Sequence, residues 1–219
     1  MPKVNAASDL HFITDVIRHT LATTTSDRSR SAPSIIALIE SAKALTDLTS
    51  ICRASPHLSG LIFAAEDFAL DLSITRTPSL LEFLFARSAI VTAARAHNLP
   101  NVIDLVCTQY KGDAGLTTLA EECAGGKALG FNGKQVIHPS QVETVQNVYG
   151  PGKEEVEWAI RVCIGDEKAD RAGKGAWTMD GKMIDAPVSG KARAVVRKAE
   201  QAGWDVAALR ERWKGQEPE

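Results

Sequence analysis

The amino-acid sequence predicts an α/β fold in which helices cover a parallel sheet. Short apolar runs at residues 34–40, 60–67 and 102–107 are typical of strands that are buried on both faces. Stretches with helical periodicity lie between them, near residues 42–53, 77–97 and 117–129. Because strand and helix alternate, consecutive strands are expected to lie parallel and to be joined by right-handed connections.

The first elements follow from local signals. Residues 2–4 are interpreted as the end of a strand, and the apolar spacing after Ser8 predicts a capped helix. A polar loop at residues 23–33 leads into the run that ends at Glu40. A helix over residues 42–53 then connects to the run that ends at Asp67.

The later elements repeat this order. Thr77-Pro78 is typical of a helix start, and the helix is expected to reach about residue 97. The strand at 102–107, a helix at 117–129, a last strand within residues 130–139 and a helix capped by Ser140 follow. About five strands result, whereas a closed (β/α)8 barrel has eight, so the sequence predicts a barrel that lacks about three units at its front.

The pattern changes beyond residue 150. Residues 151–171 are expected to form a charged amphipathic helix, and Asp180-Gly181 predicts the turn of a β-hairpin. A final helix is expected at 188–202, followed by a polar tail with Trp204 and Trp213. We therefore predict two parts, a partial barrel at 1–150 and a C-terminal lid or arm at 151–219.

Composition limits the possible functions. Of the 219 residues, 44% are hydrophobic and 24% are charged, and the net charge of −2 argues against nucleic acid as a partner. No apolar run has the length of a membrane span, and the first residues resemble neither a signal nor a transit peptide. Four cysteines without zinc-type spacing indicate reduced, buried thiols, as expected in the cytoplasm or the mitochondrial matrix.

The most informative residues are two acids that each close an apolar run. Glu40 and Asp67 are 27 positions apart, about the length of one strand–helix–strand repeat. Such spacing brings both carboxylates to the same end of neighbouring parallel strands, where they would suit a hard cation such as Mg2+. The alternative is that each acid is a helix cap or a solvated loop residue.

Four segments resemble a known family. Residues 38–42, 65–72, 130–141 and 175–187 are similar, in the expected order, to the citrate lyase beta-subunit-like group of the HpcH/HpaI aldolase superfamily, especially to malyl-CoA and citramalyl-CoA lyase-like proteins. This resemblance implies a (β/α)8 TIM-barrel type fold and assembly as a trimer or a multiple of it. It also implies that Mg2+ binds to a Glu and an Asp, which match Glu40 and Asp67.

The resemblance implies a reaction as well. Family members cleave a 3-hydroxyacyl-CoA reversibly into acetyl-CoA and a 2-oxo acid. An Asp on their C-terminal lid acts as general acid/base in a neighbouring subunit, and it matches Asp185. From the residues alone, Asp185 is better read as the cap of the helix that begins near Pro187, and only the family resemblance favours the catalytic role. The family's substrate-binding arginine has no counterpart here, and Gly112 stands where an acid is usual.

Further candidates are weaker. Lys3 and Lys134 are plausible contacts for the CoA phosphates or the substrate carboxylate, although surface lysines are commoner. His138 could contact the substrate, or it could satisfy backbone groups at a strand exit.

Three more acids and two glycines carry weaker signals. Glu66 is expected on the strand face opposite Asp67, and Asp71 is expected to hold a loop. Asp104 would either support the metal ligands or form a structural pair. Gly130 and Gly133 lack a phosphate-binding pattern.

The alternative function is a non-catalytic protein. An incomplete barrel would fit a truncated paralogue, or a subunit that needs another chain to complete the barrel.

Overall fold

The structure is a computed structural model that describes residues 1–24 and 32–219. Most of the polar loop predicted at 23–33 lies outside the described residues. The chain divides into two compact units, Met1–Tyr149 and Gly150–Glu219. Each unit has its own apolar core and is described by itself.

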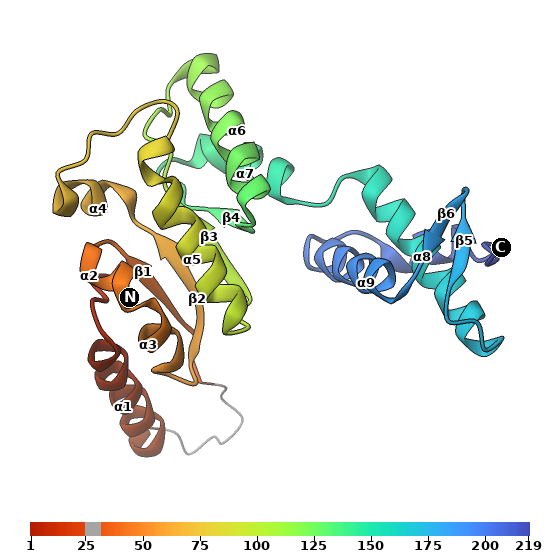
Figure 1. Cartoon of the computed structure of the whole chain (residues 1–219), viewed down its shortest axis with the longest axis horizontal. Helices are drawn as coiled ribbons and strands as arrows, with labels where there is room; N and C mark the ends of the chain where they lie inside the picture. The colour runs from red at the N-terminus through yellow and green to blue at the C-terminus, as the bar shows by residue number, and fades with distance from the viewer. Residues whose placement is uncertain (25–31) are drawn as a thin grey trace. The chain divides into compact units, whose positions relative to one another are not determined.

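A parallel sheet forms the centre of the first unit (Figure 1). Its strands are β1 (Ile35–Ile39), β2 (Leu58–Phe63), β3 (Asn101–Asp104) and β4 (Gly133–Lys134), in that order. The register pairs Ile39 with Phe63 and Asp104 with Lys134, so the carboxyl ends of the strands meet at one edge. The predicted parallel α/β arrangement is confirmed.

The first residues differ from the prediction. Residues 2–4 do not form a strand; only Met1 pairs with β1, where its amino group donates to the Ile36 carbonyl at 2.7 Å and its carbonyl accepts from Leu38 N–H at 2.9 Å. Lys3 has a φ of 53°, a left-handed conformation that does not continue an extended strand. The sheet of the described residues therefore has four strands instead of about five.

Helices connect the strands and cover the sheet. In chain order they are α1 (Ala7–Thr24), α2 (Ala42–Thr46), α3 (Leu48–Arg53), α4 (Ala65–Leu72), η1 (Leu81–Phe83), α5 (Leu84–Ala96), α6 (Gly112–Leu129), η2 (Pro139–Gln141) and α7 (Val142–Tyr149). The helix expected at 42–53 is two helices that meet at Asp47. Helix α5 packs against β2 and β3 (Figure 1).

The core of this unit lies between the sheet and its helices. Phe63 of β2 meets Phe68 of α4 and Phe83 of η1 edge to face, with ring centroids 5.3 and 5.7 Å apart. All three rings are almost fully buried. Each such ring contributes apolar burial and a favourable ring contact, so the loop after β2 is packed firmly onto the sheet.

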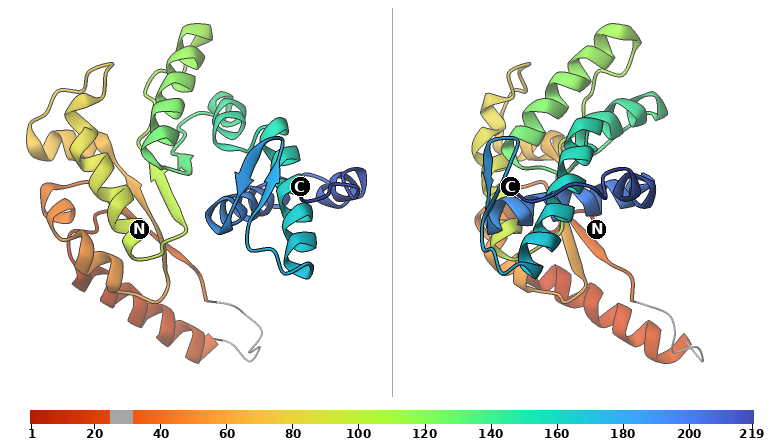
Figure 2. Two further views of the ribbon diagram at one scale, coloured as in Figure 1. Left: turned by 45° about the vertical axis from the view of Figure 1, so that its right-hand side comes forward. Right: turned by 90° about the vertical axis from the view of Figure 1, so that its right-hand side faces the viewer.

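The second unit contains α8 (Lys153–Arg171), β5 (Trp177–Met179), β6 (Lys182–Ile184), α9 (Ala186–Gln201) and α10 (Val206–Arg212). The predicted hairpin is confirmed: β5 and β6 pair antiparallel, and Asp180 and Gly181 both have positive φ, as a type I′ turn requires (Figure 2). Helix α10 replaces part of the predicted polar tail. No helix in the described parts of the chain has the length and apolar character needed to cross a bilayer.

Candidate active site

Glu40 directly follows β1 at the carboxyl edge of the sheet. Only 8% of the residue is exposed, and its Oε1 has no hydrogen-bond partner among the described residues. A buried carboxylate oxygen without a partner is costly unless a cation or a donor from outside the chain satisfies it. Glu40 is thus suited to bind a ligand.

Asp67 lies in the first turn of α4, not in a strand. Strand β2 ends at Phe63, and Ala64 N–H donates to the Ile39 carbonyl at 3.0 Å, so α4 begins beside the residue that carries the first carboxylate. The apolar run continues through Ala64 and Ala65 into the start of α4. Periodicity alone cannot separate a short buried strand from a helix start, so the predicted strand extends too far. The Asp67 side chain is exposed.

The neighbours of Asp67 correct a second expectation. Glu66 was predicted on the opposite strand face, but both acids occupy the first turn of α4. Asp71, one turn further, accepts a hydrogen bond from Ala42 N–H at 2.8 Å and holds the loop after Glu40, as expected. This bond ties α4 to the segment that carries the buried carboxylate.

The donor set fits a hard divalent cation. Two carboxylates lie at the same edge of the sheet, and one of them has an unpartnered buried oxygen. Among the described residues no group of three or more His, Cys, Asp or Glu side chains is placed to hold a metal. Glu40 and Asp67 would therefore leave the remaining coordination positions to water or substrate, as Mg2+ commonly does.

A chain of ion pairs lies next to this edge. Arg76 Nη1 pairs with Glu66 at 2.5 Å, Arg76 Nη2 pairs with Glu122 at 2.8 Å, and Lys134 Nζ lies 2.9 Å from the other Glu122 oxygen. Burial alone lowers the pKa of Arg76, but Glu66 and Glu122 raise it overall. The Lys134 side chain is fully buried in this pair. Its role as a substrate contact remains a prediction.

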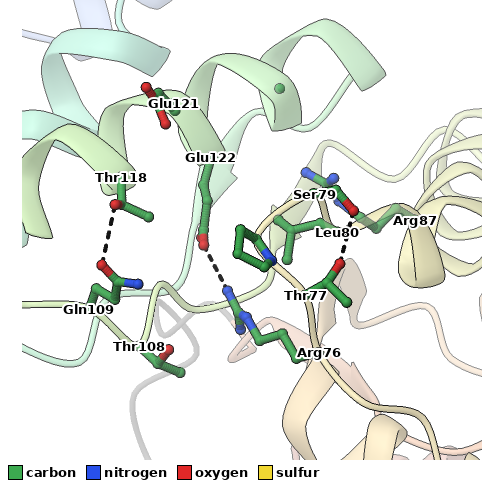
Figure 3. Close-up of a pocket in the computed structure, with 12 residues that line it drawn as sticks. Arg76, Thr77, Ser79, Leu80, Arg87, Thr108, Gln109, Thr118, Glu121 and Glu122 are labelled. Atoms are coloured by element: carbon green, nitrogen blue, oxygen red, sulfur yellow. Dashed lines mark hydrogen bonds and ion pairs between the residues drawn. The ribbon is translucent and has the colours of Figure 1, made fainter.

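Arg76 also lines a cavity of about 450 Å³ (Figure 3). Its other lining residues come from the loop before η1, from α5, from the loop after β3 and from α6. They are Thr77, Pro78, Ser79, Leu80, Arg87, Thr108, Gln109, Thr118, Glu121, Glu122 and Gly125. Nine of the twelve lining residues have polar or charged side chains.

Asp104 forms a structural pair, one of its two predicted roles. It is fully buried, and both oxygens accept from Arg87, at 3.1 Å from Nε and 2.6 Å from Nη2. This bidentate geometry compensates two buried charges and fixes α5 against β3. Arg87 was not identified from the sequence.

The remaining predicted residues have local roles. His138 is exposed, accepts from Ser140 N–H at 3.2 Å as the cap of η2, and stacks on Tyr110 with ring centroids 5.3 Å apart. Lys3 is exposed. Asp185 caps α9 by accepting from Val188 N–H at 3.1 Å, and it is half-buried. These observations match the local alternatives and leave roles in substrate binding or catalysis as predictions.

The cysteines are inert thiols in this environment. All four are buried and free, as predicted. Burial raises the pKa of Cys52 and of Cys123 to about 11, so both are neutral at physiological pH. Neither is suited to act as a nucleophile.

Comparison with protein families gives two overlapping matches. The profile of HpcH/HpaI aldolase/citrate lyase matches residues 1–139, and that of C-C bond lyases of the TIM-barrel fold matches residues 80–203. Among solved structures, a citrate lyase from Burkholderia xenovorans has a TM-score of 0.73 at 21% identity, covering 96% of this chain and 66% of that one. The predicted barrel-type fold class is confirmed.

Similar proteins include two named lyases. The chain is 36% identical over 204 residues to citrate lyase subunit beta of Escherichia coli K12, covering 93% of this chain and 65% of the relative. It is 32% identical over 208 residues to the mitochondrial citramalyl-CoA lyase of Homo sapiens, covering 91% of this chain and 59% of the relative. The chain thus spans less than two thirds of the length of these relatives.

One similar structure holds ligands. The protein CitE from Mycobacterium tuberculosis, in complex with magnesium, acetoacetate and coenzyme A, has a TM-score of 0.65 at 28% identity. The similarity covers 91% of this chain and 67% of that one.

Proposed function

Because the chain belongs to the HpcH/HpaI aldolase/citrate lyase family, we propose that it is a Mg2+-dependent carbon–carbon lyase acting on a 3-hydroxyacyl-CoA of the citramalyl-CoA or malyl-CoA type. The products would be acetyl-CoA and a 2-oxo acid, and the reverse condensation would use the same site. The relatives named citrate lyase subunit beta and citramalyl-CoA lyase support this reaction class.

One observation carries the proposal: the buried, unpartnered Oε1 of Glu40 beside the helix that bears Asp67. Together the two carboxylates would hold Mg2+, which when bound supplies a Lewis acid that polarises the keto oxygen of a 2-oxo acid. The magnesium in the similar CitE structure supports Mg2+ as the cation.

Asp185 is the proposed general acid/base, acting on the site of a neighbouring subunit in a trimer or a multiple of it. In the cleavage direction a base takes the proton of the 3-hydroxyl group, the bond between C3 and C2 breaks, and its electron pair passes to C2. Protonation of C2 gives acetyl-CoA, and C3 becomes the keto carbon of the 2-oxo acid.

The remaining predicted contacts belong to the same proposal. Lys3 and Lys134 would contact the CoA phosphates or the substrate carboxylate, and His138 would donate to the substrate or to a phosphate group. The proposed compartment is the cytoplasm or the mitochondrial matrix, which the four buried free thiols support.

The test separates metal binding from turnover. Purified chain is incubated with Mg2+ and either citramalyl-CoA or malyl-CoA, and acetyl-CoA is measured by chromatography while free CoA thiol is measured with a thiol reagent. Glu40→Gln should abolish acetyl-CoA release and weaken Mg2+ binding in calorimetry. Asp15→Asn, an acid-to-amide change on α1, should affect neither.

Release of free CoA without acetyl-CoA would replace lyase activity with thioester hydrolysis. No reaction at all, together with no Mg2+ binding, would contradict the proposal. Mg2+ binding without turnover would instead support the alternative, a subunit that needs another chain to complete the site.

A further inference from the structure

Arg76 connects three segments at the carboxyl edge of the sheet. Its Nη1 pairs with Glu66 in the first turn of α4 at 2.5 Å. Its Nη2 donates to the Val106 carbonyl, in the loop after β3, at 3.1 Å and to Glu122 of α6 at 2.8 Å. Figure 3 shows the guanidinium directed at Glu122 across the cavity. One side chain therefore fixes the segments that follow two neighbouring strands.

The inner part of this arrangement is anchored. The Glu122 side chain is only 9% exposed and takes one cation on each oxygen, Arg76 on one and the fully buried Lys134 on the other. Pairs in such surroundings are screened less than surface pairs. The Arg76 guanidinium is thus held in place from α6 and β4.

The outer part reaches the proposed metal ligand. Helix α4 has no side-chain cap, since its N-cap residue is Ala64. Its first turn is instead bound through Glu66, the residue immediately before Asp67. The Glu66 side chain is 51% exposed. The bond to Glu66 thus fixes the start of α4 at the residue next to Asp67, in addition to the Asp71 bond and the Phe68 packing further along the helix.

We propose that Arg76 is a positioning residue for the metal site: it holds the first turn of α4 through Glu66 so that Asp67 faces the cation bound by Glu40. This inference rests on the proposed function. Partners that orient metal ligands from behind commonly change metal affinity by about 10–100-fold when they are lost.

The experiment measures cation affinity directly on the full chain. Mn2+, which accepts the same oxygen ligands, is titrated and followed by electron paramagnetic resonance, with Mg2+ as competitor. Arg76→Met should weaken Mn2+ binding by roughly tenfold or more, and Arg76→Lys should recover part of the loss. Arg161→Met is the matched control, because Arg161 has similar exposure (23% against 17%) and a bidentate pair with Asp180 in the other unit.

A second variant keeps the test independent of folding. Glu66→Gln removes a half-exposed charge and should fold normally, as circular dichroism would verify, while Mn2+ binding weakens by several-fold. Faster amide exchange in α4 should accompany the weaker binding. Wild-type affinity in folded Glu66→Gln, or in folded Arg76→Met, would overturn the positioning role. Failure of the unaltered protein to bind Mn2+ would overturn the proposed metal site itself.

Discussion

Removal of Arg87 should destabilise the first unit selectively. Arg87→Met leaves the Asp104 carboxylate fully buried after it loses bonds of 3.1 and 2.6 Å. Removing one partner of a buried pair costs about 3–5 kcal/mol, because the remaining charge has neither a partner nor water. With a urea slope of about 2 kcal/mol per molar, the unfolding midpoint should fall by about 1.5–2.5 M.

The distribution of aromatic residues makes the assay specific. Trp158, Trp177, Trp204 and Trp213 all belong to the second unit. Tryptophan fluorescence therefore follows that unit, whereas far-ultraviolet circular dichroism follows both. The Arg87→Met variant should lower the midpoint of the dichroism transition assigned to the first unit and leave the fluorescence transition in place.

Two further variants decide the cause. Arg87→Met with Asp104→Leu removes both charges and should be more stable than Arg87→Met alone. Arg18→Met removes an exposed partner of Asp15 and should leave the midpoint almost unchanged, because water screens that pair. If Arg87→Met cost less than about 1 kcal/mol, or the double variant were less stable still, the buried-charge argument would be refuted.

Three other predictions test separate features. Gly126→Ala should destabilise by about 1–3 kcal/mol in urea unfolding, because its Cβ would lie 2.4 Å from buried side-chain oxygens, whereas Gly125→Ala faces open space and should be neutral or slightly stabilising. Asp185→Asn should lose acetyl-CoA release while thermal stability stays near wild type, since asparagine also caps helices, and equal activity would leave Asp185 as a cap only. Because burial raises the pKa of the Cys52 and Cys123 thiols from 9.0 to about 11, the unfolded chain loses protons first; the urea midpoint should therefore fall between pH 9 and 11 and stay constant below pH 8.

The sheet was predictable because strands buried on both faces have continuous apolar runs. The ends of its strands were harder to predict. The run after Gly60 continues through two alanines that belong to α4, so Asp67 was assigned to a strand. Helix α10 was missed although its signal is present: Asp205 caps it by accepting from Ala208 N–H at 2.9 Å, and Val206 and Leu209 have helical spacing.

Glu40 was identifiable because an acid at the end of an apolar strand is a local pattern. The ion pairs around it are not local, since Arg76 and Glu122 are 46 residues apart. The sequences of α5 and α6 nevertheless contain a signal for a buried charge. Glu122 lies three residues after buried Leu119, and Arg87 shares the buried face of α5 with Ile90, so each places a charge among apolar positions.

The sharing of Glu122 between Arg76 and Lys134 limits how this sequence can change over generations. A neutral residue at Glu122 leaves two cations facing each other, and a neutral residue at Lys134 leaves half of a carboxylate without a partner. Single changes at these positions are therefore disfavoured, and replacements have to arise as compensating sets. A library randomised at all three positions should return combinations in which the charges balance.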